Sequence, residues 1–213
     1  MRLILGSKSP RRRELLAGLD IPFDVVDIDA DETCPADLRA GDIPLYISRA
    51  KARAYAHRLR EDEWLITADT IVWCDAQMLG KPADEADARR MLRLLSGRTH
   101  QVYTGVTLTG ADGRMESFVD ATDVTFRELT DEEIDYYVAR YRPLDKAGAY
   151  GIQEWIGYVG CTALSGSYFN VMGLPVERLC ETQQRSPYET LFDFAVTRIS
   201  PSFSVGFMLS PET

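Results

Sequence analysis

A short polar loop near the N-terminus combines residue types that bind phosphate. Residues 6–9, Gly-Ser-Lys-Ser, separate an apolar run at 3–5 from a predicted helix over 11–17, with Ser9 as its N-cap and Pro10 as its first residue. Backbone N–H groups at such a helix start can face an anion, and Arg11, Arg12 and Arg13 can donate paired hydrogen bonds to phosphate oxygens. The loop is not a Walker A motif, because G-x-x-x-x-G-K-[ST] occurs nowhere in the chain. A solvated basic helix start is the structural alternative, although cations beside the positive end of a helix dipole favour a compensating anion.

A single carboxylate follows the third predicted strand. Asp69 comes directly after the apolar residues 64–68, and open α/β sheets bind ligands at the carboxyl ends of their strands. Asp69 could act there as a general base or a metal ligand, whereas a turn or N-cap aspartate is the structural alternative. Lys81, between Gly80 and Pro82, favours a site, because neither a helix surface nor a strand surface explains a lysine there.

Two further segments carry polar groups suited to a nucleotide. Residues 145–153 contain a charged pair, glycines that permit close backbone approach, and Gln153, whose amide could read the edge of a base. A Gly-rich turn with a solvated ion pair is the alternative. A run of acidic residues could supply carboxylates for Mg²⁺, namely Asp27, Asp29, Asp31 and Glu32. An acidic surface loop is the structural alternative for this run.

The elements that must position these residues alternate between strands and helices. Strands are predicted at 3–5, 23–28, 64–68 with an extended continuation at 71–74, 101–108 and 116–126, and helices at 11–17, 44–60, 84–95, 130–140 and 175–182. The turn at 110–113 joins the last two strands as an antiparallel hairpin, and 145–173 is expected to be mainly loop around short strands. This order predicts an α/β fold with a mixed sheet.

Composition excludes several classes of function. The 213 residues include 24 Lys+Arg and 33 Asp+Glu, a net charge of −9, which disfavours general binding to polymeric nucleic acid or to anionic membranes. The N-terminal apolar run is too short for a signal peptide, and no stretch is long enough to span a membrane. The four cysteines form no close pair, as expected of reduced thiols, so a cytoplasmic protein is predicted.

Several motifs in order resemble one known family. They are Leu-Gly-Ser-Lys-Ser-Pro-Arg-Arg at 5–12, Ala-Asp-Thr-Ile-Val at 68–72 followed by Lys81-Pro82, Thr-His-Gln-Val at 99–102, and Asp-Lys-Ala-Gly-Ala-Tyr-Gly-Ile-Gln at 145–153. Together they resemble the Maf family of nucleoside triphosphate pyrophosphatases over roughly residues 2–181. The resemblance implies a mixed twisted β-sheet flanked by helices around a central nucleotide-binding cleft, formed by residues 1–182, with a C-terminal tail at 183–213.

Ala-Asp-Thr and the later Gln153 are similar to the branch of the family that acts on dTTP and UTP, or on modified pyrimidine nucleotides, in a house-cleaning role. Residue by residue, the resemblance makes Asp69 the proton acceptor and ties Arg12, Thr70 and Gln153 to substrate choice. The remaining pocket positions that it implies are Ser7, Glu32, Lys51 and Lys81.

The implied reaction is hydrolysis between the α- and β-phosphates, with charge stabilised by Arg12, Lys51 and Lys81 and with Mg²⁺ or Mn²⁺ bound by Asp69 and Glu32. The family also implies a homodimer. Two alternatives stay open: a nucleotide-binding regulator of cell division without turnover, and a 7-methyl-GTP pyrophosphatase. Glu154 and Trp155 follow Gln153 where relatives tend to have small residues, so they are expected to narrow the mouth of the pocket.

Overall fold

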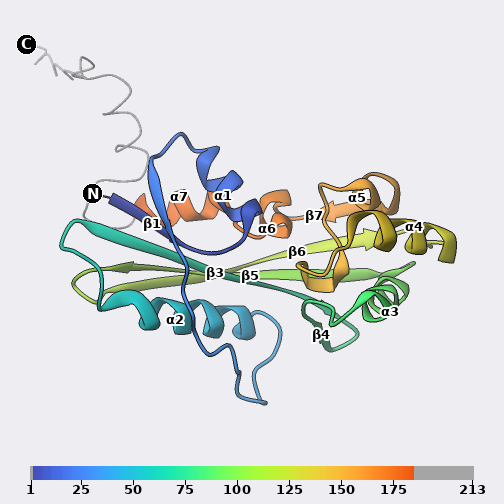
Figure 1. Ribbon diagram of the computed structural model, residues 1–213, viewed down its shortest axis with the longest axis horizontal. Helices are drawn as coiled ribbons and strands as arrows, with labels where there is room; N and C mark the ends of the chain where they lie inside the picture. The colour runs from blue at the N-terminus through green and yellow to red at the C-terminus, as the bar shows by residue number, and fades with distance from the viewer. Residues whose placement is uncertain (1, 185–213) are drawn as a thin grey trace, which may run out of the picture.

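In the computed structural model, which describes residues 2–184, seven strands form one twisted mixed sheet (Figure 1). Their order across the sheet is β2-β1-β3-β5-β6-β7, and β4 pairs with β3 beside this path. Only the β1 pairs with β2 and β3 are parallel, so the predicted α/β fold with a mixed sheet is confirmed. The strands are β1 (Arg2–Gly6), β2 (Phe23–Val26), β3 (Glu63–Cys74), β4 (Gln77–Leu79), β5 (Thr99–Gly110), β6 (Met115–Phe126) and β7 (Cys161–Ser165).

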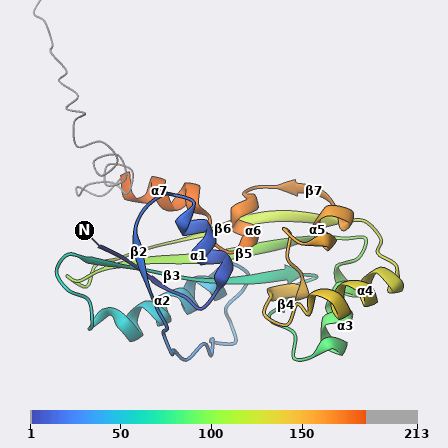
Figure 2. The ribbon, with the colours of Figure 1, turned by 45° about the horizontal axis from the view of Figure 1, so that its top comes forward.

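Helices cover both faces of the sheet. Helix α2 lies along one face, while α1, α6 and α7 lie on the other, and α3 and α4 pack together toward one end (Figures 1 and 2). The helices are α1 (Pro10–Ala17), α2 (Asp42–Ala56), α3 (Glu85–Leu95), α4 (Asp131–Tyr141), the 3-10 turn η1 (Ala147–Ala149), α5 (Trp155–Gly160), α6 (Tyr168–Met172) and α7 (Val176–Gln184).

Helices α1 and α4 begin where their capping residues predict, whereas α2, predicted over 44–60, spans Asp42–Ala56 and has no side-chain cap. The side chain of Ser9 accepts a hydrogen bond from the Arg12 N–H at the start of α1, and Pro10 is the first helical residue. Asp84 caps α3, and Thr130 with Glu133 forms a complete capping box at α4. The predicted starts of α1 and α4 are therefore confirmed, and α3, predicted over 84–95, begins one residue later at Glu85.

Two predictions about local structure are wrong. The segment 145–173 contains two short α-helices, α5 and α6, as well as the single strand β7 and is not mainly loop. Helices of six and five residues are too short to show a periodic apolar pattern in the sequence. The strand before Asp69 also does not end at Ala68, because β3 continues without interruption to Cys74.

A gap in the pairing of β3 explains how Asp69 can still lie at a strand end. The parallel partner β1 stops at Gly6, opposite Thr67, and β4 begins to pair only at Val72. On that edge, residues 68–71 of β3 have no strand partner within the described part of the chain. Asp69 therefore borders the carboxyl end of the neighbouring strand β1. The gap also leaves side chains on both faces of β3 accessible.

Helix α2 is held close to the sheet by small and polar residues. A Cβ atom at Gly105 on β5 would lie 2.4 Å from backbone atoms of Pro44 and Leu45, so only glycine allows this approach. The buried hydroxyl of Ser48 lies 2.9 Å from Thr107 Oγ1, and Thr67 Oγ1 donates to the Ser48 carbonyl at 2.8 Å. These contacts fix the position of α2 along β3 and β5.

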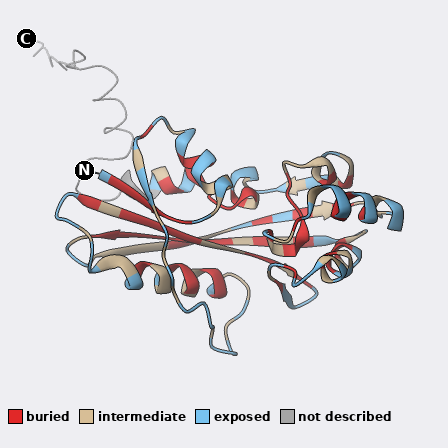
Figure 3. Cartoon of the chain, viewed as in Figure 1, coloured by how far each residue is buried: buried red, intermediate tan, exposed pale blue. Residues whose placement is uncertain are grey.

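The core lies between the sheet and the inner faces of the helices, and the outer helix faces are exposed (Figure 3). All four cysteines are free, in agreement with the prediction of reduced thiols. No helix among residues 2–184 is both long and apolar enough to span a membrane. Helix α7 continues two residues beyond the predicted boundary at 182, and the rest of the predicted tail, 185–213, lies outside the described residues.

Candidate active site

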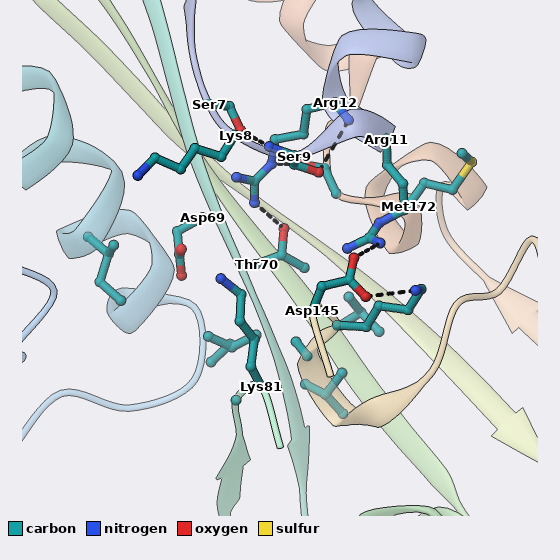
Figure 4. A pocket seen from close by; sticks show the side chains of 18 of the residues that line it. Ser7, Lys8, Ser9, Arg11, Arg12, Asp69, Thr70, Lys81, Asp145 and Met172 are labelled. Carbon is teal, nitrogen blue, oxygen red and sulfur yellow. Dashed lines mark hydrogen bonds and ion pairs between the residues drawn. The ribbon is translucent and has the colours of Figure 1, made fainter. Parts of the chain in front are cut away.

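A cavity of about 720 Å³ opens at the gap beside β3. Its lining combines the loop after β1, the start of α1, α2, the middle of β3, the segment after β4 and residues 145–153, so segments far apart in the sequence meet there (Figure 4). The lining includes all of the predicted site residues, namely Ser7, Arg12, Glu32, Lys51, Asp69, Thr70, Lys81 and Gln153.

Asp69 forms an ion pair with Lys51 at the centre of this lining. The Lys51 Nζ atom donates to Asp69 Oδ1 at 2.9 Å, and the two side chains are 13% and 16% exposed. Lys51 lies one helical turn after Ser48, and Asp69 lies two residues after Thr67, so each shares a face with a residue of the α2 anchor. The docking of α2 on the sheet therefore sets the distance between the two charges.

Glu32 brings a second carboxylate to the same lysine. Its Oε1 atom lies 2.9 Å from Lys51 Nζ, the same distance as Asp69 Oδ1. Burial raises the pKa of Glu32, but the hydrogen bond and charge of Lys51 outweigh this, and the pKa lies below its usual value. Both carboxylates can therefore offer oxygen atoms to a hard divalent cation near this point. No group of three or more His, Cys, Asp or Glu side chains within residues 2–184 is placed to hold a metal ion.

Arg12 makes more structural contacts than the sequence predicts. Its guanidinium donates to the carbonyls of Gly173 and Ala68, each at 2.8 Å, and to Thr70 Oγ1 at 3.0 Å. Burial lowers the pKa of Arg12, although the charge of Asp69 opposes that effect. Arg12 therefore ties α1 to β3 and to the end of α6, and only part of its guanidinium is left to face a ligand.

Thr70 lies on the opposite face of β3 from Asp69, because side chains alternate along a strand. Its hydroxyl accepts the Arg12 hydrogen bond and also lies 2.9 Å from Thr104 Oγ1 (Figure 4 shows the contact with Arg12). Both faces of β3 line the cavity because the strand has an open edge there. Thr70 can thus influence a ligand through the position of Arg12.

Two lysines extend into the same space as Asp69 (Figure 4). Neither Lys8 nor Lys81 makes a hydrogen bond or ion pair with another described residue, so both ammonium groups are available to phosphate oxygens. Ser7, beside Lys8, is buried, and its Oγ accepts the N–H of Ser9 at 3.2 Å. Lys8 lies within the motif at 5–12 but was not predicted as a site residue, since an exposed loop lysine carries no signal of its own.

Gln153 lines the cavity and carries an unsatisfied acceptor. Its Oε1 atom is buried and has no hydrogen-bond partner among the described residues. A buried amide oxygen without a partner is costly, so a rotation of the Gln153 side chain that turned this oxygen toward a hydrogen-bond donor of a ligand in the cavity would remove that cost.

The segment before Gln153 contains an ion-pair cluster, for which a solvated pair was the structural alternative. Asp145 lies 2.9 Å from Arg11 Nη1 and 2.8 Å from Lys146 Nζ (Figure 4 shows the contact with Arg11). Burial raises the pKa of Asp145, but hydrogen bonds from Lys146 and Arg11 keep it below its usual value. Lys146 is buried, so the solvated interpretation is wrong for the lysine.

Other sequence expectations about this site need correction. Glu154 and Trp155 do not line the cavity, so they do not narrow its mouth. Glu154 turns inward to Lys146 at 3.1 Å, and the Trp155 ring packs against Tyr136. Within the acidic run, Asp29 and Glu32 line the cavity, whereas Asp27 and Asp31 do not.

Comparison with known proteins finds relatives of this chain that carry one and the same name. Relatives named dTTP/UTP pyrophosphatase from Phocaeicola vulgatus and Bacteroides thetaiotaomicron are 59% and 54% identical to it over 179 residues, which is 84% of this chain and 92% of each relative. A solved structure of the Staphylococcus aureus Ham1 protein has 15% identity and a TM-score of 0.44, and the match covers 59% of this chain and 72% of that one. Residues 2–185, which include the whole cavity lining, match the family described as Maf-like protein. The chain therefore belongs to the Maf family.

Proposed function

We propose that this protein hydrolyses dTTP and UTP between the α- and β-phosphates and releases the monophosphate and pyrophosphate. The names of the two relatives support the substrates. The observation that carries the reaction type is the carboxylate of Asp69, held 2.9 Å from Lys51 in a cavity that Lys8 and Lys81 also line. An oriented base surrounded by cations is what water attack on a triphosphate requires.

In this mechanism Asp69 accepts the proton of the attacking water. One carboxylate oxygen stays on Lys51, which fixes the orientation of the group, and within the described residues the other oxygen takes no hydrogen bond. Water attacks the α-phosphorus, the bond to the bridging oxygen breaks, and pyrophosphate leaves. Negative charge grows on the departing group, where Lys8 and Lys81 can stabilise it.

We also propose that Asp69 and Glu32 bind Mg²⁺ or Mn²⁺ together with the substrate. The donor set fits, because Mg²⁺ is usually held by one or two protein carboxylates and completed by phosphate oxygens and water. Such a cation, when bound, adds positive charge near the phosphates and makes water more acidic.

Gln153 supports a preference for thymine and uracil. Both bases carry an N–H group at N3, which can donate to the unsatisfied Oε1 of Gln153. Cytosine has an acceptor at N3 and a donor only in its exocyclic amino group, so a cytosine placed with N3 against the amide would leave that oxygen without a donor. A site with such a group rejects the mismatched base strongly, by up to about 10⁴-fold.

A nucleotide panel tests the proposal. Pyrophosphate release is measured with dTTP, UTP, dCTP, dGTP and 7-methyl-GTP, each with Mg²⁺ and with Mn²⁺, and dTTP and UTP are expected to react fastest. Faster turnover of 7-methyl-GTP would assign the chain to the other branch of the family. Binding of dTTP without hydrolysis of any nucleotide would favour the nucleotide-binding regulator of cell division.

We further propose a cytoplasmic homodimer with no polymeric nucleic acid or membrane as partner. The acidic net charge of −9 supports the exclusion of nucleic acid. Sedimentation equilibrium checks the oligomeric state, and the expected mass is twice the 24.0 kDa of one chain.

A further inference from the structure

A polar cluster lies behind the segment that presents Gln153. Tyr137, on α4, is fully buried, and its hydroxyl donates to Glu154 Oε2 and accepts the N–H of Gly151 at 3.0 Å. Glu154 also donates its own N–H to the Gly151 carbonyl at 3.0 Å. The side chains of Tyr137 and Glu154 therefore fix both ends of the turn 151–154, which carries Gln153.

Lys146 completes the cluster. Its side chain is 9% exposed, and its Nζ atom lies 3.1 Å from Glu154 Oε1 and 2.8 Å from Asp145 Oδ1. Asp145 in turn accepts from Arg11 on α1 at 2.9 Å. A continuous series of polar contacts thus runs from Arg11 in the first turn of α1 to Tyr137 on α4. The residues between them are Asp145, Lys146 and Glu154.

Stability alone does not account for this arrangement. A buried ion pair loses solvation energy comparable to its Coulomb energy, and apolar residues of similar size often stabilise a fold as well or better. A buried pair does, however, fix geometry, because moving either partner leaves an unpaired charge. Packing adds to this restraint, since a Cβ atom on Gly151 would lie 2.9 Å from the Glu154 side chain.

We propose that Tyr137, Glu154 and Lys146 are positioning residues that hold Gln153 for recognition of the base and so determine the selectivity for dTTP and UTP. This inference rests on the proposed function and deepens it. Tyr137 and Glu154 do not line the cavity, so their influence passes through the turn that they hold. The lone acceptor of Gln153 can discriminate bases only if its direction is fixed, because hydrogen-bond strength falls steeply as the geometry worsens.

Two variants test the inference. Glu154→Gln keeps the shape and an acceptor for Tyr137 but removes the charge that pairs with Lys146, and Tyr137→Phe removes the hydroxyl that contacts both Glu154 and Gly151. The control is Tyr136→Phe, which removes a hydroxyl from the neighbouring position on the same helix, where the ring is half exposed and packs on Trp155. For each protein, kcat/KM is measured for dTTP, UTP and dCTP, together with inhibition by pyrophosphate and the melting temperature.

The expected result is that both variants lose about tenfold in the ratio of kcat/KM for dTTP over dCTP, the cost of one misdirected hydrogen bond. The loss should come mainly from a higher KM for dTTP, and inhibition by pyrophosphate should stay within about twofold of the parent. The control should match the parent. A purely structural role would lower the melting temperature without changing the ratio.

An unchanged dTTP to dCTP ratio in both variants would overturn the inference while leaving the proposed function intact. A parallel loss of pyrophosphate inhibition would also overturn it, because the whole cavity would then have been disturbed. If the parent hydrolyses no nucleotide, the proposed function fails, and calorimetric binding of dTMP against dCMP to the same proteins tests the positioning role separately. In that case, a lower preference for dTMP over dCMP in the variants than in the parent supports the positioning role. The same preference in the variants and the parent contradicts it.

Discussion

The ion pair between Asp69 and Lys51 orients the carboxylate that we propose as the proton acceptor. The lysine holds one carboxylate oxygen of Asp69 and also contacts Glu32, each at 2.9 Å. A carboxylate held in this way has a fixed orientation, as a proton acceptor requires. The sequence could indicate Asp69 and Lys81 as candidates, but nothing in it shows that Lys51, eighteen positions before Asp69, contacts both carboxylates.

Replacement of the proposed base gives the first prediction. Asp69→Asn should lower kcat for dTTP by about 10²–10⁴-fold, because the amide cannot accept the proton of water. The matched control is Asp27→Asn, which removes an exposed carboxylate of the same acidic run that does not line the cavity and should leave kcat nearly unchanged. Steady-state pyrophosphate release measures both, and equal activity of the Asp69→Asn variant and the parent would contradict the assignment of Asp69.

The second prediction concerns the lysine that sequence reasoning did not select. Lys8→Gln should raise KM for dTTP and weaken inhibition by pyrophosphate by about two- to fivefold, the usual worth of an exposed ion pair. Arg13→Gln serves as the control, since Arg13 is exposed near Lys8 but does not line the cavity. Equal effects of both variants would mean that general surface charge, and not a phosphate contact of Lys8, governs binding.

At the scale of elements, the site depends on where strands stop. Because β1 ends at Gly6 while β3 continues, residues 68–71 border an open space into which α1 and α2 direct their charged residues. Capping residues made the starts of α1 and α4 predictable. The sequence predicted an extended continuation at 71–74 but not that Asp69 and Thr70 join it to 64–68 in one strand, because these two residues break the apolar pattern and only the pairing with β5 keeps them in the strand.

A substitution in the contact between α2 and the sheet gives the third prediction. Gly105→Ala would force α2 away from β5, so it should destabilise the protein by about 1–3 kcal/mol. It should also lower kcat, because α2 carries Lys51. Gly18→Ala is the control, since its added Cβ would meet its nearest atom at 3.4 Å. Urea unfolding and dTTP hydrolysis measure the two effects, and a Gly105→Ala protein with parental stability and activity would contradict the role of this contact.

For the whole molecule, the acidic net charge of −9 and the basic lining of the cavity are compatible because the positive potential is local. Separated motifs of the sequence meet in this one cavity, and that convergence could be predicted from their order and their resemblance to a family. The cluster of Tyr137, Glu154 and Lys146 could not be, because it depends on a tyrosine from α4 that belongs to none of those motifs.

The fourth prediction concerns the pH dependence of folding. His100 is fully buried beside Tyr150, and burial lowers its pKa from 6.5 to about 4. Between these values the unfolded chain binds a proton that the folded protein does not, so the free energy of unfolding should fall as pH decreases from about 6.5 toward 4, by on the order of 3 kcal/mol in total.

Urea unfolding between pH 7 and 5 measures this effect in a range where most carboxylates remain ionised. His100→Gln should flatten the dependence, whereas replacement of the exposed His57 by Gln should leave it unchanged. A parental slope in the His100→Gln variant would show that another group is responsible.

The central claim is that water attacks the α-phosphorus of dTTP, and the most direct test identifies the bond that is broken. Hydrolysis of dTTP in ¹⁸O-labelled water, followed by mass spectrometry of the products, identifies the phosphorus atom that water attacks. Attack at the α-phosphorus through Asp69 predicts the label in dTMP and unlabelled pyrophosphate. Label in pyrophosphate, or products consisting of dTDP and labelled phosphate, would contradict the account.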